Sequence, residues 1–185
     1  MRELSLHILD LVTNSIEAAA NRIIIVVEER PSDNLFRIRI RDNGKGMSKE
    51  MVKKAGDPFT TSRKTRKVGM GIPLIQQVAS DCGGTLKVCS SPGMGTTVTV
   101  EMEYSNINRP PLGDIVNTII NLMISNPEIH FCYIHTVNSS RFCLDSYWFL
   151  ARMAEKNGNI YDIIQPAKEY ITKGLLKMGA SISNP

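Results

Sequence analysis

The stretch FRIRIRDNGKGM, residues 36–47, joins the pattern of a strand to a glycine-rich loop. Between residues 35 and 41, apolar side chains alternate with three arginines, so one side of the segment is apolar and the other is basic. This alternation is typical of a half-buried strand. The loop that follows opens with Asp42 and contains Gly44 and Gly46, which predicts a sharp turn directly at the end of the strand.

The residues on either side of this stretch alternate between helix and strand patterns. Apolar residues recur at helical spacing before it, and a continuous β-branched run leads into it. After it, Ser48 is the expected N-cap of a short helix, and a later helix carries Pro73 in its first turn and stops at Gly83-Gly84. We expect a helix over 3–20, a strand over 22–29, a turn over 30–34, a strand over 35–41, helices over 48–54 and from Ile72 to Gly83, and strands over 85–90 and 96–104.

Residues after 104 repeat this alternation on a smaller scale. The sequence SNINRPP predicts a linker over 105–111, between a domain over 1–104 and a C-terminal extension over 112–185. One face of the expected hairpin is apolar, and it either packs on the sheet of the first domain or recruits a partner or a second copy. That face carries Phe131, Tyr133, His135, Val137, Phe142 and Leu144. The expected elements are a helix over 112–125, strands over 129–137 and 141–146, and helical pieces over 147–180 broken near Gly158 and Pro166.

Composition and charge exclude several classes of protein. The net charge is +4, and much of the excess lies in the single run 63–67, which favours a local phosphate site over a nucleic-acid surface. No stretch approaches the ~20 apolar residues of a membrane span, and Met1 is not followed by a secretory leader pattern. The four cysteines have no metal-ligand spacing. We therefore expect a cytoplasmic protein with buried, reduced thiols and with neither a membrane nor a nucleic-acid partner.

The expected first helix carries a polar face that suits phosphate chemistry. Asp10, Asn14 and Glu17 are spaced four and three residues apart, so they share one face, roughly opposite the apolar stripe. An amide oxygen is a hard ligand for Mg²⁺, and a carboxylate one turn away can orient or deprotonate a water or hydroxyl. His7 lies on the same face, either as a group that orients Asp10 or as an ordinary histidine. The triplet also fits a plain solvated helix face.

The first glycine loop, residues 42–47, is suited to a flat aromatic base. An aspartate at a strand end can accept a hydrogen bond from the exocyclic amine of adenine, which predicts this role for Asp42. Gly44 and Gly46 let the backbone approach the base, and Met47 closes the loop. The same letters also describe an ordinary Asx–glycine turn.

Two further glycine loops extend this set. The second glycine loop, Gly69-Met70-Gly71, opens a helix whose free N–H groups can bind phosphate. It is neither a Walker loop nor a dinucleotide-binding fingerprint. In the third glycine loop, residues 93–97, the hydroxyl of Thr96 or Thr97 would reach the adenine edge or a water held by Asp42. Each loop alone is also a common turn.

Taken together and in order, these segments resemble the GHKL ATPases, the family of histidine-kinase catalytic domains, DNA gyrase, the MutL mismatch-repair ATPase and the large heat-shock chaperones. LDLVTNSIEAA, 9–19, resembles the family's N box, and the loops DNGKGM, VGMGIPL and GMGTT resemble its three glycine boxes. DPFTTSRKTRK, 57–67, is similar to a kinase F box and a short ATP lid. The resemblance implies a Bergerat-type fold, a two-layer α/β sandwich with a mixed sheet and helices on one face, plus the small C-terminal extension.

The resemblance also implies ligands and residue roles. ATP and Mg²⁺ are the expected cofactors, with Asn14 as the metal ligand and Asp10 at the general-base position, where most of the family has Glu. Asp42 would bind adenine, supported by Thr96 or Thr97. The second glycine loop would offer amides to the phosphates, and Arg63 and Lys64 in the lid would close on them.

Three functions are compatible with this resemblance, because the N box and first glycine loop are similar to MutL whereas the lid and second glycine loop are similar to histidine kinases and anti-sigma-factor kinases. The chain carries no phosphoacceptor helix pair ahead of its N box, and its tail is short for a gyrase- or MutL-type transducer. We expect a stand-alone regulatory kinase or ATPase that acts on a partner protein. The alternatives are an ATP-gated interaction module of MutL type, with a possible homodimer, and a non-catalytic nucleotide-binding regulator.

Overall fold

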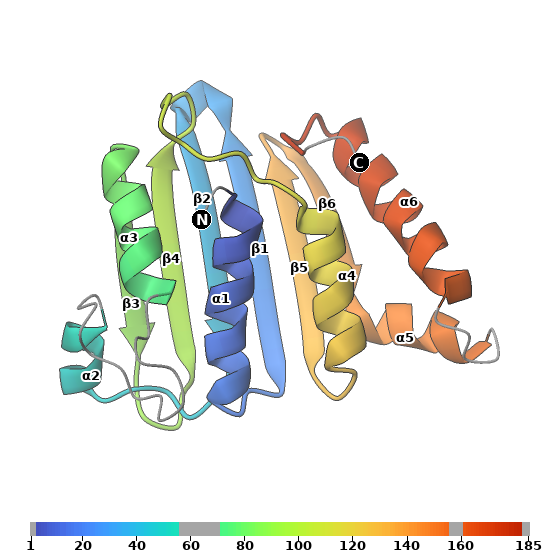
Figure 1. Ribbon diagram of the computed structural model, residues 1–185, viewed down its shortest axis with the longest axis horizontal. Helices are drawn as coiled ribbons and strands as arrows, with labels where there is room; N and C mark the ends of the chain where they lie inside the picture. The colour runs from blue at the N-terminus through green and yellow to red at the C-terminus, as the bar shows by residue number, and fades with distance from the viewer. Residues whose placement is uncertain (1–2, 56–70, 156–160, 183–185) are drawn as a thin grey trace.

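The computed structural model describes residues 3–55, 71–155 and 161–182 of the chain. Six strands in these residues form one sheet in the order β3-β4-β2-β1-β5-β6 (Figure 1). The elements are α1 (Leu4–Glu17), β1 (Arg22–Arg30), the 3-10 turn η1 (Pro31–Asp33), β2 (Leu35–Asp42), α2 (Lys49–Lys54), α3 (Gly71–Asp81), β3 (Thr85–Ser90), β4 (Thr96–Glu103), α4 (Ile115–Ser125), β5 (His130–Val137), β6 (Ser140–Asp145), α5 (Ser146–Glu155) and α6 (Tyr161–Lys177).

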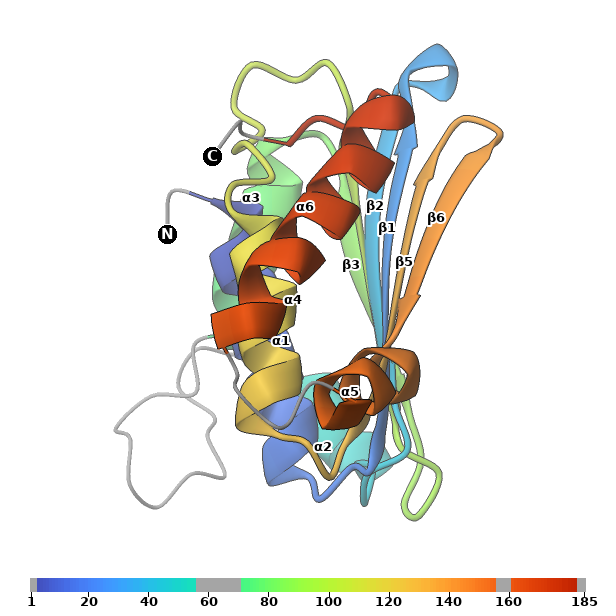
Figure 2. The same cartoon turned by 90° about the vertical axis from the view of Figure 1, so that its right-hand side faces the viewer.

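The protein has two layers, a mixed sheet and a layer of helices. β5 pairs with β1 in parallel, and the other neighbouring strands are antiparallel. Viewed from the side, α1, α3, α4 and α6 lie on one face of the sheet, and no helix of the described residues lies on the other face (Figure 2). This arrangement confirms the predicted α+β sandwich. Among the described helices, none combines the length and apolar character needed to cross a membrane.

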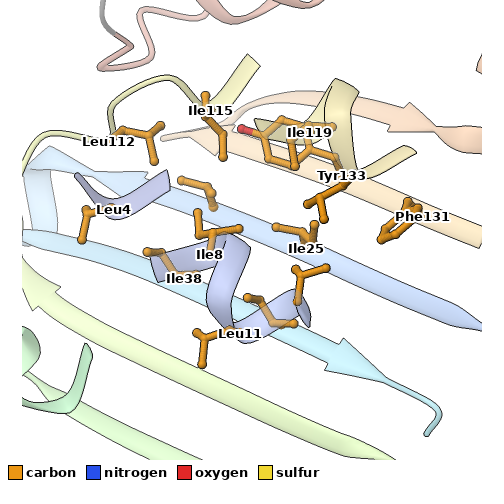
Figure 3. Packing of buried hydrophobic residues seen from close by; sticks show 14 of the residues in the cluster. Leu4, Ile8, Leu11, Ile25, Ile38, Leu112, Ile115, Ile119, Phe131 and Tyr133 are labelled. Atoms are coloured by element: carbon orange, nitrogen blue, oxygen red, sulfur yellow. The ribbon is translucent and has the colours of Figure 1, made fainter. Parts of the chain in front are cut away.

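The core fills the space between the two layers. Alternate residues of each strand point into it, as the period of two along a strand requires; in β1 these are Ile23, Ile25 and Val27, all at most 1% exposed. The apolar stripe of α1 packs on them between β1, β2 and α4 (Figure 3). The residues that meet there include Leu4, Ile8, Leu11, Ile25, Ile38, Ile115, Ile119, Phe131 and Tyr133.

The C-terminal hairpin extends this sheet rather than packing on top of it. Its predicted apolar face is confirmed, because all six side chains named for it are at most 9% exposed. The hairpin is held at the edge of β1, where Ile25 lies opposite Tyr133 and Val27 lies opposite His135. Its inner side lies under α4 and α6 (Figure 2). The core therefore runs without a break from β3 to β6.

Several helix boundaries differ from the expected ones for local reasons. α1 ends at Glu17 because Ala19 takes a left-handed conformation, with φ of 58°, that turns the chain into β1. α4 begins at Ile115 because Asp114 is its N-cap and accepts a hydrogen bond from the Asn117 amide. The break expected near Pro166 is wrong, since Pro166 lies inside α6. A proline removes one intrahelical bond, and the buried Ile171 and Leu175 anchor the helix after it.

Candidate functional site

Asp42, the last residue of β2, lies at the centre of the candidate site. Its side chain is buried, with 7% of the residue exposed. Oδ2 accepts a hydrogen bond from the Ser15 hydroxyl at 2.8 Å, and Oδ1 accepts from the backbone amides of Gly44 at 2.9 Å and Thr96 at 3.1 Å. An ionised carboxylate has about four lone-pair positions, so these three donors fix its orientation and leave it able to accept one more.

The first and third glycine loops interlock around this carboxylate. Gly46 and Gly95 have φ angles of 66° and 79°, a region in which glycine is favoured. A Cβ on Gly95 would lie 2.0 Å from the carbonyl oxygen of Asp42, and one on Gly46 would lie 2.0 Å from the carbonyl oxygen of Ser91. Glycine is therefore required at both positions for the two loops to come this close.

Ser90 joins the same two loops through its hydroxyl. This oxygen accepts a hydrogen bond from the Met47 amide and donates one to the Gly95 carbonyl, both at 2.8 Å. It also lies 3.0 Å from the hydroxyl of Thr96. Met47, which the sequence places in the site, is thus held by its backbone.

The polar residues of α1 lie beside the start of α3. A Cβ on Gly71 would lie 3.5 Å from Nδ2 of Asn14 and 3.5 Å from Oδ2 of Asp10. The structure therefore brings Asp10, Asn14 and Gly71 together. Asn14 and Ser15 are consecutive, so one turn of α1 faces the start of α3 and also binds the carboxylate of Asp42.

Asn43 ties the first glycine loop to the beginning of β1. Its Oδ1 accepts hydrogen bonds from the amides of Asn21 at 3.1 Å and Arg22 at 2.9 Å, and its Nδ2 donates to Oδ1 of Asn21 at 2.6 Å. The carbonyl of Asn21 in turn accepts from the amide of His130, the first residue of β5, at 2.9 Å. A continuous set of hydrogen bonds thus connects the loop to the C-terminal hairpin.

Other residues predicted for the site have different outcomes. Glu17 is exposed at the end of α1. Thr97 is not brought to Asp42, which corrects the prediction for that threonine: it lies opposite Arg41 and Cys89 on the other face of the sheet, because successive residues of a strand alternate. Thr96 contacts Asp42 through its amide rather than its hydroxyl. Arg63, Lys64, Gly69 and Met70 lie outside the described residues.

His7 is buried rather than placed on a polar face, which corrects the prediction for this residue. It is 1% exposed, and neither ring nitrogen has a hydrogen-bond partner within the described residues. Burial lowers the pKa of His7, the positive chain terminus lowers it further, and Asp10 raises it by less. The histidine is therefore neutral at physiological pH, packed one turn before Asp10.

Sequence reasoning missed Ser15 and Ser90. Both are small polar residues whose partners lie elsewhere in the chain; Ser15 and Asp42 are 27 positions apart along the sequence. One signal for Ser15 was present: it continues the apolar stripe from Ile8 and Leu11 at helical spacing, and a serine at such a position must find a partner.

Known proteins match the part of the chain that carries this site. Residues 2–106 match the family described as histidine kinase-, DNA gyrase B-, and HSP90-like ATPase. The sensor histidine kinase ZraS of Escherichia coli strain K12 is 27% identical over 57% of this chain and 23% of its own length. Sporulation kinase B of Bacillus subtilis strain 168 is 32% identical over 51% of this chain and 22% of its own. The chain thus spans less than a quarter of either kinase.

A solved structure shares the fold over a longer stretch. The crystal structure of the N-terminal domain of a DNA repair protein superposes with a TM-score of 0.57 and 19% sequence identity. The match covers 78% of this chain and 53% of that one, so it extends beyond the 2–106 region into the C-terminal hairpin or the helices that cover it.

Proposed function

This chain belongs to the histidine kinase-, DNA gyrase B-, and HSP90-like ATPase family, and from this premise we propose that it binds Mg-ATP around Asp42 and acts as a regulatory kinase or ATPase on a partner protein. The observation that carries the proposal is the buried Asp42 carboxylate, which three donors orient and which retains one acceptor position. An adenine amine is a donor of the kind that fits this position.

Each residue has a distinct role in this proposal. Asp42 accepts from the adenine amine, while Ser15 and the Thr96 amide hold the carboxylate in place. Asn14 is the protein ligand of Mg²⁺, which neutralises phosphate charge when bound. Gly71, at the start of α3, permits phosphate to approach the helix N-terminus. For Gly69, Met70, Arg63 and Lys64, phosphate binding rests on the sequence resemblance alone.

Asp10 is the proposed general base or orienting group for the phosphoryl acceptor. It lies one turn before Asn14 and shares the start of α3 with it. Its side chain is one methylene shorter than the glutamate common in the family, so it reaches the acceptor less directly. We therefore expect slow turnover by the isolated chain. Transfer to a partner protein is the activity to test first.

Calorimetric titration of Mg-ATP, Mg-ADP and Mg-GTP tests the binding part of the proposal. We expect adenine nucleotides to bind and GTP not to bind. Asp42→Asn should weaken ATP binding at least tenfold, because a hydrogen bond to a charged group contributes ~1.5–3 kcal/mol and ~1.4 kcal/mol is tenfold. Asp33→Asn, at the exposed turn between β1 and β2, is the matched control. Unchanged affinity in Asp42→Asn would contradict the assigned pocket.

Label transfer from γ-labelled ATP tests the activity. Partner proteins labelled by the wild type but not by Asp10→Asn would support a kinase, and phosphate release without transfer would support an ATPase. If nucleotide binds while both activities stay at background with and without a partner, the chain is a non-catalytic regulator.

One observation favours an ATP-gated interaction module as a second candidate. The hydrogen bonds from Asn43 through Asn21 to His130 link the proposed base-binding loop to β5. A nucleotide that tightens the loop would act on the hairpin through this connection. Small-angle scattering with and without Mg-ATP measures the effect; unchanged curves and unchanged mass would reject gating.

A further inference from the structure

No described helix covers the outer face of the sheet (Figure 2). Three rows of side chains run across this face through all six strands. Each row contains one residue from every strand, and the strand register sets these residues opposite one another from β3 at one edge to β6 at the other. The first row is Thr85, Glu101, Arg37, Glu28, Thr136 and Arg141. The second is Lys87, Thr99, Arg39, Val26, Ile134 and Cys143, and the third is Cys89, Thr97, Arg41, Ile24, Cys132 and Asp145.

The first row satisfies its own charges. Arg37 lies 2.7 Å from a carboxylate oxygen of Glu28 on one side and 2.7 Å from one of Glu101 on the other. Burial lowers the pKa of Arg37, but the contacts with the two carboxylates outweigh this effect and raise the pKa above its ordinary value. Arg37 is thus paired with one carboxylate from each of the two neighbouring strands.

The second and third rows leave their cations unpaired. Arg39 and Arg41 occupy the same strand and face as Arg37, but their neighbours are threonines on β4 and apolar residues on β1. Lys87 lies two strands from Arg39 in the second row. Within the part of the chain that the structure describes, none of these three cations, all exposed, has a carboxylate at ion-pair distance.

The other half of these two rows is apolar. Ile24, Val26, Ile134 and Cys132 are all partly exposed, and they continue the rows directly from the arginines across β1 and β5. The one carboxylate of the two rows, Asp145, lies at the far edge and binds His130 at 2.8 Å. The surface is thus divided into a basic half over β3, β4 and β2 and an apolar half over β1 and β5, with Cys143 and Asp145 of β6 at its edge.

From this division we propose that the second and third rows form a docking surface for an acidic, apolar-faced segment of another protein. Carboxylates of the segment pair with Arg39, Arg41 and Lys87, as Glu28 and Glu101 pair with Arg37, and its apolar side chains cover Ile24, Val26 and Ile134. Six strands spaced about 4.8 Å apart make the surface about 24 Å wide. A helix of about 16 residues has that length.

Charge and composition argue against three other occupants. A second copy that presents the same face offers few carboxylates to these cations, because its Glu28 and Glu101 are already paired with Arg37. Single-stranded nucleic acid binds through aromatic stacking platforms, and the three rows contain no Phe, Tyr or Trp. Interfacial membrane binding relies on Trp, Phe and Leu side chains, and the three rows contain none of these. The proposal does not depend on nucleotide binding.

The test uses a synthetic helical peptide of about 16 residues whose binding face carries Glu over one half of its length and Leu and Val over the other half. Two matched peptides accompany it: a scramble of the same composition without the face, and a version with Lys in place of every Glu. Anisotropy titrations of the full chain should show the first peptide binding at least tenfold more tightly than either other peptide. Equal affinities, or no binding by the first peptide at millimolar protein, would overturn the proposal.

Two variants locate the binding. Arg39→Glu with Lys87→Glu, both exposed, should weaken the first peptide at least tenfold and leave Mg-ATP affinity unchanged. Lys173→Glu with Lys177→Glu on α6, with the same change of charge, should alter peptide binding less than twofold. Methyl NMR signals of Val26 and Ile134 should shift with peptide, whereas those of the buried Ile23 and Ile25 should not. Equal weakening by both double variants would overturn the proposal.

Alternative ligands complete the test. A 20-nucleotide single strand, a 20-base-pair duplex and phosphatidylglycerol vesicles are titrated at the same ionic strength. Tighter binding by any of these than by the acidic peptide, abolished by Arg39→Glu with Lys87→Glu, would replace the proposed partner with that class of ligand.

Discussion

The hydroxyl of Ser15 on α1 donates a hydrogen bond of 2.8 Å to Oδ2 of Asp42 at the end of β2. Both side chains are buried, so this contact fixes the carboxylate from the helix side while backbone amides fix it from the loop side. Because Ser15 directly follows Asn14, the contact also sets the distance between the proposed base site and the proposed metal ligand.

Ser15→Ala should therefore weaken Mg-ATP binding three- to thirtyfold while the chain stays folded. Hydrogen bonds to charged groups contribute ~1.5–3 kcal/mol, and part of that loss appears in binding because the carboxylate gains freedom to turn. Thr13→Ala is the matched control, since the Thr13 hydroxyl on the same helix donates to the carbonyl of Leu9 within that helix. Calorimetric titration of Mg-ATP into both variants measures the effect. Equal affinities of the two variants for Mg-ATP would show that the loop amides alone position Asp42.

The sequence was a good guide to the strands because their period of two is a local property. The alternation of Phe36, Ile38 and Ile40 with arginines predicted β2, and the same period would have excluded Thr97 from the site, given that Val98 and Val100 point inward. His7 was misplaced because the buried face of α1 is wider than its apolar stripe and includes Ser5, His7 and Ser15.

Long-range placement was the part that local patterns do not encode. The hairpin was expected, but its position beside β1 depends on which strand offers a free edge. The apolar run of residues 23–27 held a signal, because apolar residues on both faces of a strand favour a central place in a sheet over an exposed edge. The contacts of Ser15 and Ser90 depend on which segments of the chain meet in space, and the periodic patterns of a sequence do not show this.

Gly95→Ala should be far more disruptive than Gly93→Ala. Both glycines have positive φ, 79° and 75°, so the backbone strain of an alanine is similar at the two sites. A Cβ at Gly95 would meet the Asp42 carbonyl at 2.0 Å, whereas one at Gly93 would meet nothing within 4 Å. We expect Gly95→Ala to lower the free energy of unfolding by at least ~2 kcal/mol more than Gly93→Ala and to abolish ATP binding. Urea unfolding and calorimetry on both variants measure this, and similar values would contradict the loop contact.

Glu29 is expected to stabilise the C-terminal end of the chain in a pH-dependent way. It is fully buried, lies 2.8 Å from Nε2 of His135, and accepts hydrogen bonds from the amide and hydroxyl of Ser181. Burial raises the pKa of Glu29, but the hydrogen bonds from His135 and Ser181 together outweigh it and lower the pKa below 4.5. A lowered carboxyl pKa means that the stabilisation is present above 4.5 and is lost as the pH falls through the folded-state value.

Glu29→Gln should accordingly lower the free energy of unfolding by ~2–3 kcal/mol at pH 7, with a difference from wild type that shrinks as the pH falls below 4.5. Glu128→Gln, at an exposed position before β5, should have little effect at either pH. Urea unfolding at pH 7 and pH 4 gives both numbers. A difference independent of pH would mean that shape, and not charge, accounts for the role of Glu29.

His7 should make the folded protein less stable as the solution becomes mildly acidic. Burial lowers the pKa of His7 below 6.5. Below pH 6.5 the histidine is therefore protonated more readily in the unfolded chain than in the folded chain. The free energy of unfolding consequently falls as the pH falls. His7→Leu removes this difference together with two buried nitrogens that lack partners in the described residues. We expect the variant to be at least as stable as wild type at pH 7.5 and to lose less stability by pH 5.5, the gap approaching ~1 kcal/mol per pH unit below 6.5. Urea unfolding across this range tests the expectation. If the free energy of unfolding of His7→Leu falls with pH as steeply as that of the wild type, another group causes the acid sensitivity. A large loss of stability at pH 7.5 would show that the ring makes contacts that a leucine cannot replace.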